Sequence, residues 1–342
     1  MNNEKPTTPW AASAAPLRPL DLDSNFQKNK EKMPGSLRAK VDAMVEHIQR
    51  LKQSILAFSG GVDSAVVGAL LKFANADQSL LVTAVSPSLS NRQQKIAKYA
   101  AGEIGLPHRW LETQEGQDPN YQKNAEDRCY YCKSHLFDAL WAIANHFPHA
   151  TLISGTNLDD LSDHRPGLVA ANQFQVFAPL AQYQVGKAEV RQIATAFGLW
   201  VDDLPAAPCL ASRIAYGISV TPQRLARIES AEAMIWELGF SDVRVRLLPQ
   251  NTASIEVPLA ETWRLIKLQR ETATSTNLAG STNLAGSTPD PPTSPPTSPP
   301  TNHPQHNHPL LDQIKALGFD SVVIDPKGLR SGNLNNLVNL GP

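Results

Sequence analysis

The sequence has little cysteine and almost no net charge. Its three cysteines among 342 residues are a small and odd number, which argues against a disulfide scaffold and favours thiol chemistry or metal ligation. Lys plus Arg (31) balance Asp plus Glu (32), so there is no overall basic field to bind nucleic acid without specificity. A nucleic-acid partner is therefore not expected, and a tRNA substrate would need a local basic patch.

The sequence also lacks long apolar runs. No run approaches the ~18 residues that a membrane span needs. The stretch from Met1 to Asn25 has neither a charged start before a hydrophobic segment nor a cleavage pattern. We therefore expect a cytoplasmic protein without membrane contact. With 42% hydrophobic residues, a chain of this length can bury a substantial core and is expected to form two domains.

The most informative segment is Ser59–Ser64 (Ser-Gly-Gly-Val-Asp-Ser), which separates an apolar stretch at Ser54–Phe58 from an Ala/Val/Leu-rich stretch ending near Phe73. A strand, a Gly-rich turn and a helix start present backbone N–H groups at the positive end of a helix dipole, an arrangement that holds phosphates. The glycines let the backbone approach an anion, and the hydroxyls add hydrogen-bond donors. The residues expected to hold phosphate are Ser59, Gly60, Gly61 and Ser64.

Asp63 is an acidic residue in a loop whose other groups suit anions. A carboxylate in such a loop is best explained by a Mg²⁺ ion bound next to it. The segment lacks the Gly-Lys-Ser/Thr ending of the Walker loop, so a γ-phosphate clamp of that kind is not indicated. It resembles the pyrophosphate loop of the PP-loop ATP pyrophosphatases, which split ATP into AMP and pyrophosphate to activate a carbonyl-type oxygen as an adenylate. A turn chosen only for tightness is the weaker interpretation, because strand, turn, acid and helix agree.

Four apolar segments alternate with helical stretches in the first half of the chain, which predicts a parallel sheet covered by helices. The expected strands are Ile55–Phe58, Leu80–Val85, His108–Glu112 and Thr151–Ser154, and the expected helices are Ala65–Phe73, Arg92–Ile104 and Lys133–Phe147. Ligands bind at the carboxyl ends of such strands, so the Ser59 turn and Gly155 should share one edge. The expected fold class is α/β: a parallel-sheet PP-loop (adenine nucleotide α-hydrolase-like) domain followed by a small α+β C-terminal domain.

The domain organisation follows from composition and turn signals. We expect a flexible N-terminal segment at 1–35, the PP-loop domain at 36–216, and the C-terminal domain at 217–342. A Ser/Thr/Pro-rich insertion at 271–308 interrupts the C-terminal domain; it is repetitive and has no apolar face, so we expect it to be disordered. Three histidines at its end could bind a metal, but histidines in such a linker are more often solvated; they are His303, His306 and His308.

The second chemical cluster is the pair Cys129-x-x-Cys132 with the remote Cys209. Flanking cationic side chains lower the pKa of a thiol and favour the thiolate form. The three cysteines can therefore act as soft metal ligands. A structural zinc site would need a fourth ligand such as His135, whereas three cysteines leave one corner of a [4Fe–4S] cluster open. A Cys129–Cys132 redox pair and a purely structural role for all three cysteines remain as alternatives.

Together these segments resemble the LarE family, the ATP-dependent sulfur transferases that make the nickel-pincer nucleotide cofactor of lactate racemase. The resemblance covers residues 38–270 and 309–337, and the combination is specific where each part alone is not. The segments that carry it are Ser59–Ser64, Arg128–Lys133, Gly155–Asp160, Asp163–Gly167, Pro208–Gly217 and Gly328–Gly332.

The resemblance implies a substrate and a sulfur chemistry. The substrate would be the small molecule pyridinium-3,5-biscarboxylic acid mononucleotide, whose carboxylates are adenylated and converted to thiocarboxylates. Some members sacrifice the sulfur of one cysteine, which matches Cys209 here. Others also carry the Cys-x-x-Cys pair and resemble cluster enzymes in which an iron-bound sulfide is the donor. Because this chain has all three cysteines, we favour a [4Fe–4S] cluster on Cys129, Cys132 and Cys209. A sulfur donor or cysteine desulfurase and a homo-oligomeric state are also expected.

Roles in the nucleotide site follow from this chemistry. We expect ATP with Mg²⁺ near Asp63 and Asp160, because the metal would neutralise the leaving pyrophosphate. Thr156 and Asn157, at a strand end, are expected to shape the adenylate pocket. Arg213, next to the cysteine Cys209, could steady a carboxylate or phosphate and keep the sulfur anionic.

Other charged residues have two interpretations each. Arg244 and Arg246 share a strand face and could bind the substrate phosphate, or they could form a solvated strand face. Glu229 and Glu232 could be acid/base groups or metal ligands, although an exposed acidic helix face is favoured for the pair; Glu232 is retained as a catalytic candidate with Cys209, Asp63 and Arg213. Lys187 could contact phosphate or form a salt bridge within its own helix.

Two rival functions remain open from the sequence. A tRNA-thiolating PP-loop enzyme would share ATP, cysteines and adenylation but should have a basic RNA-binding surface. A non-catalytic nucleotide-binding module would retain the ATP site without turnover.

Overall fold

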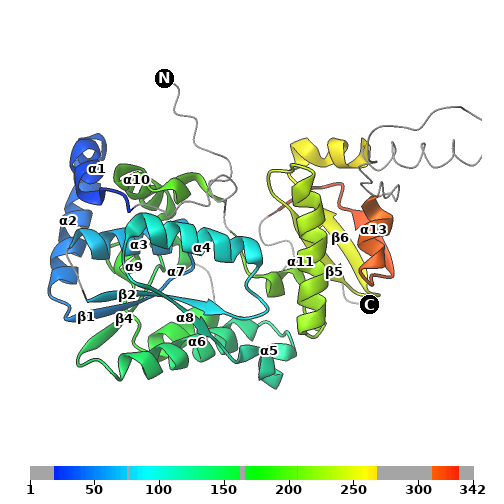
Figure 1. Ribbon diagram of the computed structural model, residues 1–342, viewed down its shortest axis with the longest axis horizontal. Coiled ribbons are helices and arrows are strands. Elements are labelled where there is room, and N and C mark those ends of the chain that lie inside the picture. The colour runs from blue at the N-terminus through cyan, green and yellow to red at the C-terminus, as the bar shows by residue number, and fades with distance from the viewer. Residues whose placement is uncertain (1–18, 75–77, 162–165, 206, 268–309, 331–342) are drawn as a thin grey trace, which may run out of the picture. The chain divides into compact units, whose positions relative to one another are not determined.

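The computed structural model describes residues 19–74, 78–161, 166–205, 207–267 and 310–330 (Figure 1). The chain divides into two compact units, Met1–Leu225 and Ala226–Pro342. The division falls inside a helix, α11 (Pro222–Glu237), whereas the sequence places the boundary just before that helix, at Gly217. The predicted insertion at 271–308 lies outside the described residues.

The first unit contains a four-stranded sheet in the order β3-β2-β1-β4, with every neighbouring pair parallel. Its strands are β1 (Gln53–Ala57), β2 (Ser79–Val85), β3 (His108–Glu112) and β4 (Ala150–Ser154). The predicted parallel α/β arrangement is confirmed. In the register, Ile55 of β1 lies beside Leu80 of β2 and Leu152 of β4.

Alternate strand residues face two different helical layers, as the period of two requires. Ile55, Val82 and Leu152 pack against α6 (Arg128–Ala144) and α8 (Pro166–Gln173). Their neighbours in the strands pack on the other face with α3 (Val62–Phe73) and α4 (Asn91–Ile104). Figure 1 shows these helices on opposite sides of the sheet. Because both faces are covered, the central strands β2 and β1 carry consecutive apolar residues at Leu80–Val82 and Ile55–Ala57.

The prediction of a flexible segment at 1–35 is wrong from Leu22 onward. Helix α1 (Leu22–Asn29) begins at Asp21, whose carboxylate accepts a hydrogen bond from the Ser24 N–H at 3.0 Å. The Phe26 ring is buried, 4.9 Å from the Phe73 ring and 4.7 Å from the Phe197 ring between centroids. Only two apolar residues, spaced i and i+4, fix this helix to the core, which is too weak a pattern to recognise among polar neighbours.

The remaining elements of the first unit surround the sheet. They are α2 (Gly35–Gln49), α5 (Pro119–Gln122), α7 (Leu158–Leu161), α9 (Pro179–Gln182) and α10 (Lys187–Phe197), with short 3₁₀ turns η2 (Lys30–Lys32), η3 (Glu115–Gln117), η4 (Trp200–Asp203) and η5 (Leu210–Arg213). None of the helices in the described ranges is long and apolar enough to cross a membrane.

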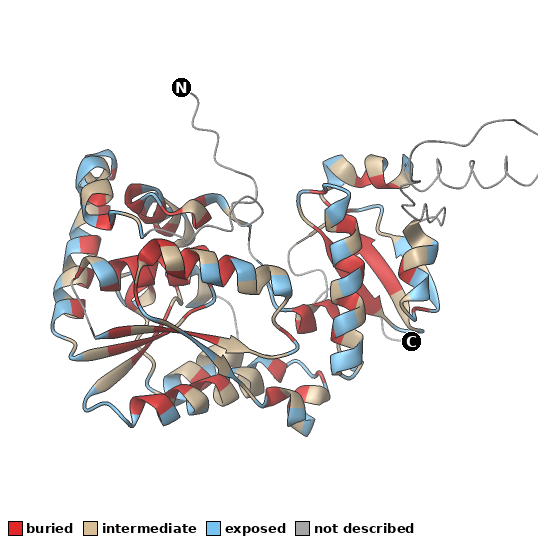
Figure 2. Cartoon of the chain, in the orientation of Figure 1, coloured by how far each residue is buried: buried red, intermediate tan, exposed pale blue. Residues whose placement is uncertain are grey.

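The second unit has a three-stranded sheet in the order β5-β6-β7. Strands β5 (Arg244–Leu248) and β6 (Thr252–Glu256) are antiparallel, and β7 (Ser321–Ile324) pairs parallel to β6. Helix α13 (Leu310–Ala316) and a helical stretch at 259–267 complete it. Figure 2 shows β5 and β6 almost wholly buried, so this α+β unit has a core of its own.

The buried Phe26 ring provides a test of the N-terminal helix. We predict that Phe26→Ala lowers the free energy of unfolding by about 3–5 kcal/mol, because the cavity forms between the buried Phe197 ring and the partly buried Phe73 ring. Chemical denaturation measures the change, with Lys28→Ala as the control on the exposed side of the same helix. Equal stability of the two variants would contradict the packing of α1 against the core.

Candidate active site

The segment Ser59–Ser64 forms a tight loop between β1 and α3. Gly60 has a φ of +75°, and a Cβ at this position would lie 2.4 Å from the Cα of Ala97, so only glycine fits. Two hydroxyls fasten the loop. Ser64 Oγ donates to the Gly61 carbonyl at 3.0 Å and accepts from the Ser59 N–H at 3.3 Å, and Ser59 Oγ accepts from the Gly61 N–H at 3.3 Å. The hydroxyls of Ser59 and Ser64, which are expected to bind phosphate, therefore also shape the loop.

Gly155, which follows β4, packs directly against this loop. A Cβ on Gly155 would lie 2.7 Å from the Ser64 nitrogen, so the absence of a side chain permits the contact. The prediction that these two turns share the carboxyl edge of the sheet is confirmed. The chain after β4 can therefore contribute side chains to the phosphate loop.

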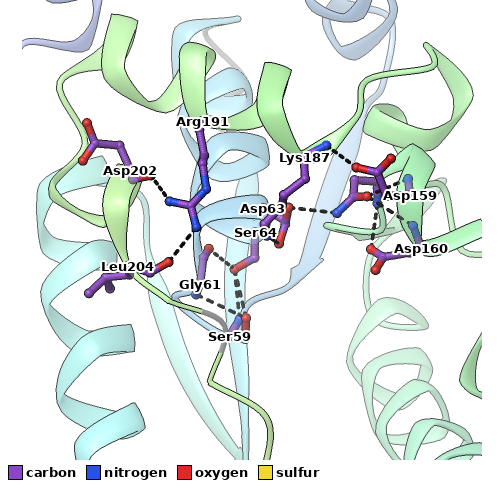
Figure 3. A network of polar contacts seen from close by, with 11 residues as sticks. Ser59, Gly61, Asp63, Ser64, Asp159, Asp160, Lys187, Arg191, Asp202 and Leu204 are labelled. Carbon is purple, nitrogen blue, oxygen red and sulfur yellow. Dashed lines mark hydrogen bonds and ion pairs between the residues drawn. The ribbon is translucent and has the colours of Figure 1, made fainter. Parts of the chain in front are cut away.

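Asp63 makes two polar contacts across the loop (Figure 3). Its Oδ1 accepts from Asn157 Nδ2 at 3.0 Å, and its Oδ2 lies 2.5 Å from Lys187 Nζ. Lys187 stands at the start of α10, and the partner in its ion pair, Asp63, lies outside that helix. Of the two expectations for Lys187, a salt bridge within its own helix is not the pairing observed, and contact with phosphate stays a prediction. Carboxylate oxygens are ligands that Mg²⁺ prefers, but a metal at Asp63 would have to displace the lysine.

Asn157 and Asp160 cap the short helix α7. The Asn157 Oδ1 accepts from the N–H groups of Asp159 and Asp160 at 2.9 and 3.2 Å, while Asp160 Oδ2 accepts from the Asn157 N–H at 3.1 Å. Asp159 Oδ2 in turn accepts from the Lys187 N–H at 2.5 Å. Thr156 Oγ1 lies 3.0 Å from Ser154 Oγ. These residues lie beside the phosphate loop as expected, and their polar groups hold one another in place.

The three cysteines gather at the start of α6. Cys129 and Cys132 lie in its first turns, and Cys209 precedes η5. Burial raises the pKa of the Cys132 thiol to about 12, and the charges of Cys209 and Cys129 act in the same direction. Arg128, which precedes Cys129, donates to the Ala211 carbonyl at 2.9 Å, and this contact places the segment after Cys209 beside the Cys-x-x-Cys pair. Cys129 and Cys209 are exposed, whereas Cys132 is partly buried.

Arg128 is the buried cation of this cluster. Its Nη1 donates to Asn124 Oδ1 at 2.5 Å and to the Ala211 carbonyl at 2.9 Å, and its Nη2 lies 3.9 Å from Cys129 Sγ. Burial alone would lower the pKa of Arg128, but the negative charges of Cys209 and Cys129 outweigh it and raise that pKa. The arginine therefore supplies a fixed positive charge beside two of the sulfurs.

The donor set suits iron and sulfur, but the cysteines do not converge as metal ligands. Among the residues with described positions, no three His, Cys, Asp or Glu side chains are arranged to hold a metal ion. His135, the candidate fourth ligand for zinc, instead contacts Asp118 Oδ2 through Nε2 at 2.9 Å. Loading a cluster would thus require the cysteine side chains to rearrange.

Arg213 is buried and holds the backbone next to Cys209. Its Nη1 donates to the Pro208 carbonyl at 2.9 Å and to Ser212 Oγ at 3.2 Å. In this arrangement Arg213 holds the turn that presents Cys209; its expected contact with a carboxylate or phosphate of the substrate stays a prediction.

Three of the charged candidate residues of the second unit are buried, namely Arg244, Arg246 and Glu232. Arg246 Nε donates to Glu256 Oε1 at 2.6 Å, and Arg244 is 8% exposed, so a solvated strand face is the wrong interpretation. Glu232 is also buried and accepts from the Val245 N–H at 3.0 Å, so it does not belong to an exposed acidic face. Glu229 is partly buried.

Three residues near the cysteines were missed by the sequence analysis. Tyr121 and Ser88 share a short hydroxyl–hydroxyl hydrogen bond, and burial together with the charge of Cys209 raises the Tyr121 pKa. Glu115 is 4% exposed, and its Oε2 has no hydrogen-bond partner among the described residues. They line a small pocket at the ends of β2 and β3. Isolated Ser, Tyr and Glu residues without a motif give no sequence signal.

Comparisons with known proteins give three relatives, while no family model matches the chain. The Synechocystis uncharacterized protein slr1717 is 41% identical over 222 residues, 65% of this chain and 82% of that protein. The Methanocaldococcus jannaschii uncharacterized protein MJ0830 is 28% identical over 206 residues, 60% of this chain and 78% of that protein. The pyridinium-3,5-bisthiocarboxylic acid mononucleotide synthase of Lactiplantibacillus plantarum is 26% identical over 302 residues, 88% of this chain and 95% of that enzyme.

The raised pKa of Cys132 predicts an order of thiol reactivity. Only the thiolate is alkylated, and a thiol with a pKa of about 12 is almost fully protonated at pH 8. In the reduced, metal-free protein we expect iodoacetamide to label Cys129 and Cys209 before Cys132. Peptide mass spectrometry over time measures the three rates. Labelling of Cys132 at the rate of the other two would contradict this environment.

Proposed function

This chain belongs to the same family as the Synechocystis protein slr1717, and from that membership and its similarity to the Lactiplantibacillus synthase we propose that it is a LarE-type, ATP-dependent sulfur transferase of nickel-pincer cofactor biosynthesis. It would adenylate the carboxylates of pyridinium-3,5-biscarboxylic acid mononucleotide and convert them to thiocarboxylates. The name of the Lactiplantibacillus enzyme, a synthase of pyridinium-3,5-bisthiocarboxylic acid mononucleotide, supports this substrate class.

The observation that carries the proposal is that the phosphate loop and the Cys209 turn lie at the same edge of the sheet. The phosphate loop follows β1, and the turn after Cys209 is joined to the loop after β2, since the Leu210 N–H donates to the Ser88 carbonyl at 2.9 Å. Gln93 Nε2 further ties this region to the phosphate loop by donating to the Ser59 carbonyl at 2.6 Å. Nucleotide activation and sulfur delivery would therefore occur at one edge of one sheet, where α/β folds bind ligands.

The Asp63–Lys187 ion pair supports a role in ATP activation. Mg·ATP supplies a cation for Asp63 and an anion for Lys187, so each partner would exchange the other for a stronger ligand on binding. The amides at Gly60 and Gly61 would then hold the pyrophosphate as it leaves. A substrate carboxylate oxygen attacks the α-phosphorus, the bond to the bridging oxygen breaks, and pyrophosphate departs with the electron pair.

The cysteines would serve the second half of the reaction. Attack of sulfur on the acyl carbon of the adenylate forms the C–S bond and expels AMP. We propose that Cys129, Cys132 and Cys209 hold a [4Fe–4S] cluster, which when bound would supply sulfur from a sulfide at the iron that no cysteine holds. Arg128 would stabilise the negative charge of the thiolates from its buried position. Sulfur taken from Cys209 itself is the alternative.

Asp63 provides the test of adenylation. We predict that Asp63→Asn lowers the rate of substrate-dependent pyrophosphate release ~10²–10³-fold, because electrostatic support for the leaving group is lost. The fold should be retained, since Asp63 is a partly exposed side chain. Asp42→Asn, on the exposed face of α2, is the matched control. Unchanged release by the Asp63 variant would remove this residue from the mechanism.

Intact mass after one turnover separates the two sulfur sources. If the cluster supplies sulfur, the wild-type polypeptide keeps its mass, and Cys129→Ala adenylates the substrate without transferring sulfur. If Cys209 is consumed, the wild-type chain loses ~34 Da, the mass of H₂S that accompanies dehydroalanine formation. A dehydroalanine at position 209 would reject the cluster as the donor.

A further inference from the structure

Glu115 is a buried carboxylate in the turn η3, which follows β3. The residue is 4% exposed. In the described ranges of the chain, its Oε2 atom is buried and has no hydrogen-bond partner. A buried carboxylate oxygen without a donor is unfavourable for folding. Departures of this kind from good packing are expected mainly at functional sites, where a ligand supplies the missing donor.

The turn that carries Glu115 is held by hydrogen bonds on both sides of the residue that follows it. The Asp118 N–H donates to the Glu115 carbonyl at 3.0 Å. Gln122 Nε2, from α5, donates to the Gly116 carbonyl at 2.7 Å. The carboxylate is therefore placed before a ligand arrives, which lowers the entropy that binding must cost.

Glu115 lines a small pocket at the carboxyl ends of β2 and β3. Most of the wall is apolar and includes Pro87 and Val220, and the space has room for little more than one water-sized group. Tyr121 and Ser88 also line the pocket, but their hydroxyls bond to each other. The free acceptor at the pocket is thus Glu115 Oε2.

The pocket adjoins the turn that presents Cys209. Ser88 lines the pocket, and its carbonyl accepts from the Leu210 N–H at 2.9 Å. Burial raises the pKa of Tyr121, and the charges of Cys209 and Glu115 act in the same direction, as expected when both lie near the tyrosine. A ligand whose reacting group lies at Cys209 can therefore reach Glu115 with another of its groups.

The pocket restricts the chemistry of its ligand. A carboxylate oxygen accepts hydrogen bonds and repels phosphate, so the ligand must bring an O–H or N–H donor. Mg²⁺ keeps an octahedral shell that includes several waters, which is larger than the room here. The amino group of adenine is fixed to a flat bicyclic ring, whereas a sugar hydroxyl projects singly and can enter a narrow space.

We infer that Glu115 binds a ribose hydroxyl of a nucleotide at this pocket. The inference rests on the proposed function, which brings two ribose-containing molecules to the site: ATP and the pyridinium dicarboxylate mononucleotide. The carboxyl ends of strands are where α/β folds bind nucleotides, and carboxylates accept ribose hydroxyls there. Glu115 thereby orients the nucleotide at the edge of the sheet that carries the phosphate loop and the Cys209 turn.

Nucleotides that lack one ribose hydroxyl test the contact. Dissociation constants of the full-length protein are measured by calorimetry for two series: Mg·ATP with its 2′-deoxy and 3′-deoxy forms, and the pyridinium nucleotide with its 2′-deoxy and 3′-deoxy forms. In one series we expect the wild-type protein to bind one deoxy form ~10–100-fold more weakly than the parent, because a hydrogen bond to a charged group is lost. The series that shows the loss identifies which nucleotide Glu115 holds.

Two variants assign the loss to Glu115. Glu115→Gln keeps a neutral acceptor and should weaken binding of the parent nucleotide about tenfold, and Glu115→Leu, which has no acceptor, should weaken it ~10–100-fold. Neither should change the affinity for the deoxy form. Both should keep or raise the Tm, because an unpaired buried carboxylate is removed. Glu112→Gln, an exposed carboxylate at the end of β3, is the matched control and should bind every nucleotide as the wild type does.

The wild-type measurement alone can overturn the inference, whether or not the variants fold. Equal affinities for parent and deoxy forms in both series would do so. Variants that weaken parent and deoxy forms equally would assign Glu115 a structural role and also overturn it. A wild-type protein that binds neither Mg·ATP nor the pyridinium nucleotide would instead contradict the proposed function, and this inference with it.

Discussion

The ion pair between Asp63 and Lys187 joins the two parts of the chain that make the nucleotide site. Asp63 belongs to the first turn after the loop that follows β1, and Lys187 opens α10, more than a hundred residues later. The pair is partly exposed, so its own contribution to stability is small. Its importance is chemical: it holds a carboxylate and an ammonium beside backbone amides, where a phosphate with its metal would exchange with both.

Close backbone contacts make this arrangement possible. Gly60 fits against α4 and Gly155 against Ser64 because neither has a Cβ, so the phosphate loop is enclosed by the chain that follows β4. The adjoining turns after β2 and β3 carry Ser88 and Glu115 toward the cysteines. Two arginines then hold the segments that carry the sulfurs. Arg128 lies next to the Cys129 sulfur, and Arg213 binds the carbonyl of Pro208, the residue before Cys209. Glycine therefore sets the shape of the nucleotide site, and arginine sets the position of the sulfur.

The sequence predicts the sheet well because its signals are local. The apolar runs expected as strands at Leu80–Val85 and Thr151–Ser154 lie within β2 and β4, and the Gly-rich loop lies at the expected strand end. Long-range pairings give no such signal. Nothing in the sequence near Lys187 indicates Asp63 as its partner. At Arg244 and Arg246, charged and apolar residues alternate in the same way whether the charged face of the strand is solvated or, as observed, buried. Helix α1 cannot be predicted from local sequence, because it is stabilised by contacts of its buried side chain Phe26 with the distant rings of Phe73 and Phe197 and not by its neighbours in sequence.

The most direct test of the account follows the oxygen atoms of the substrate. Adenylation places a carboxylate oxygen on the α-phosphorus, and attack of sulfur at the acyl carbon leaves that oxygen on AMP. With pyridinium-3,5-biscarboxylic acid mononucleotide labelled with ¹⁸O in its carboxylates, mass spectrometry of the AMP should find one labelled oxygen for each thiocarboxylate formed. Unlabelled AMP, or thiocarboxylate formed without AMP, would contradict an acyl-adenylate mechanism for this chain.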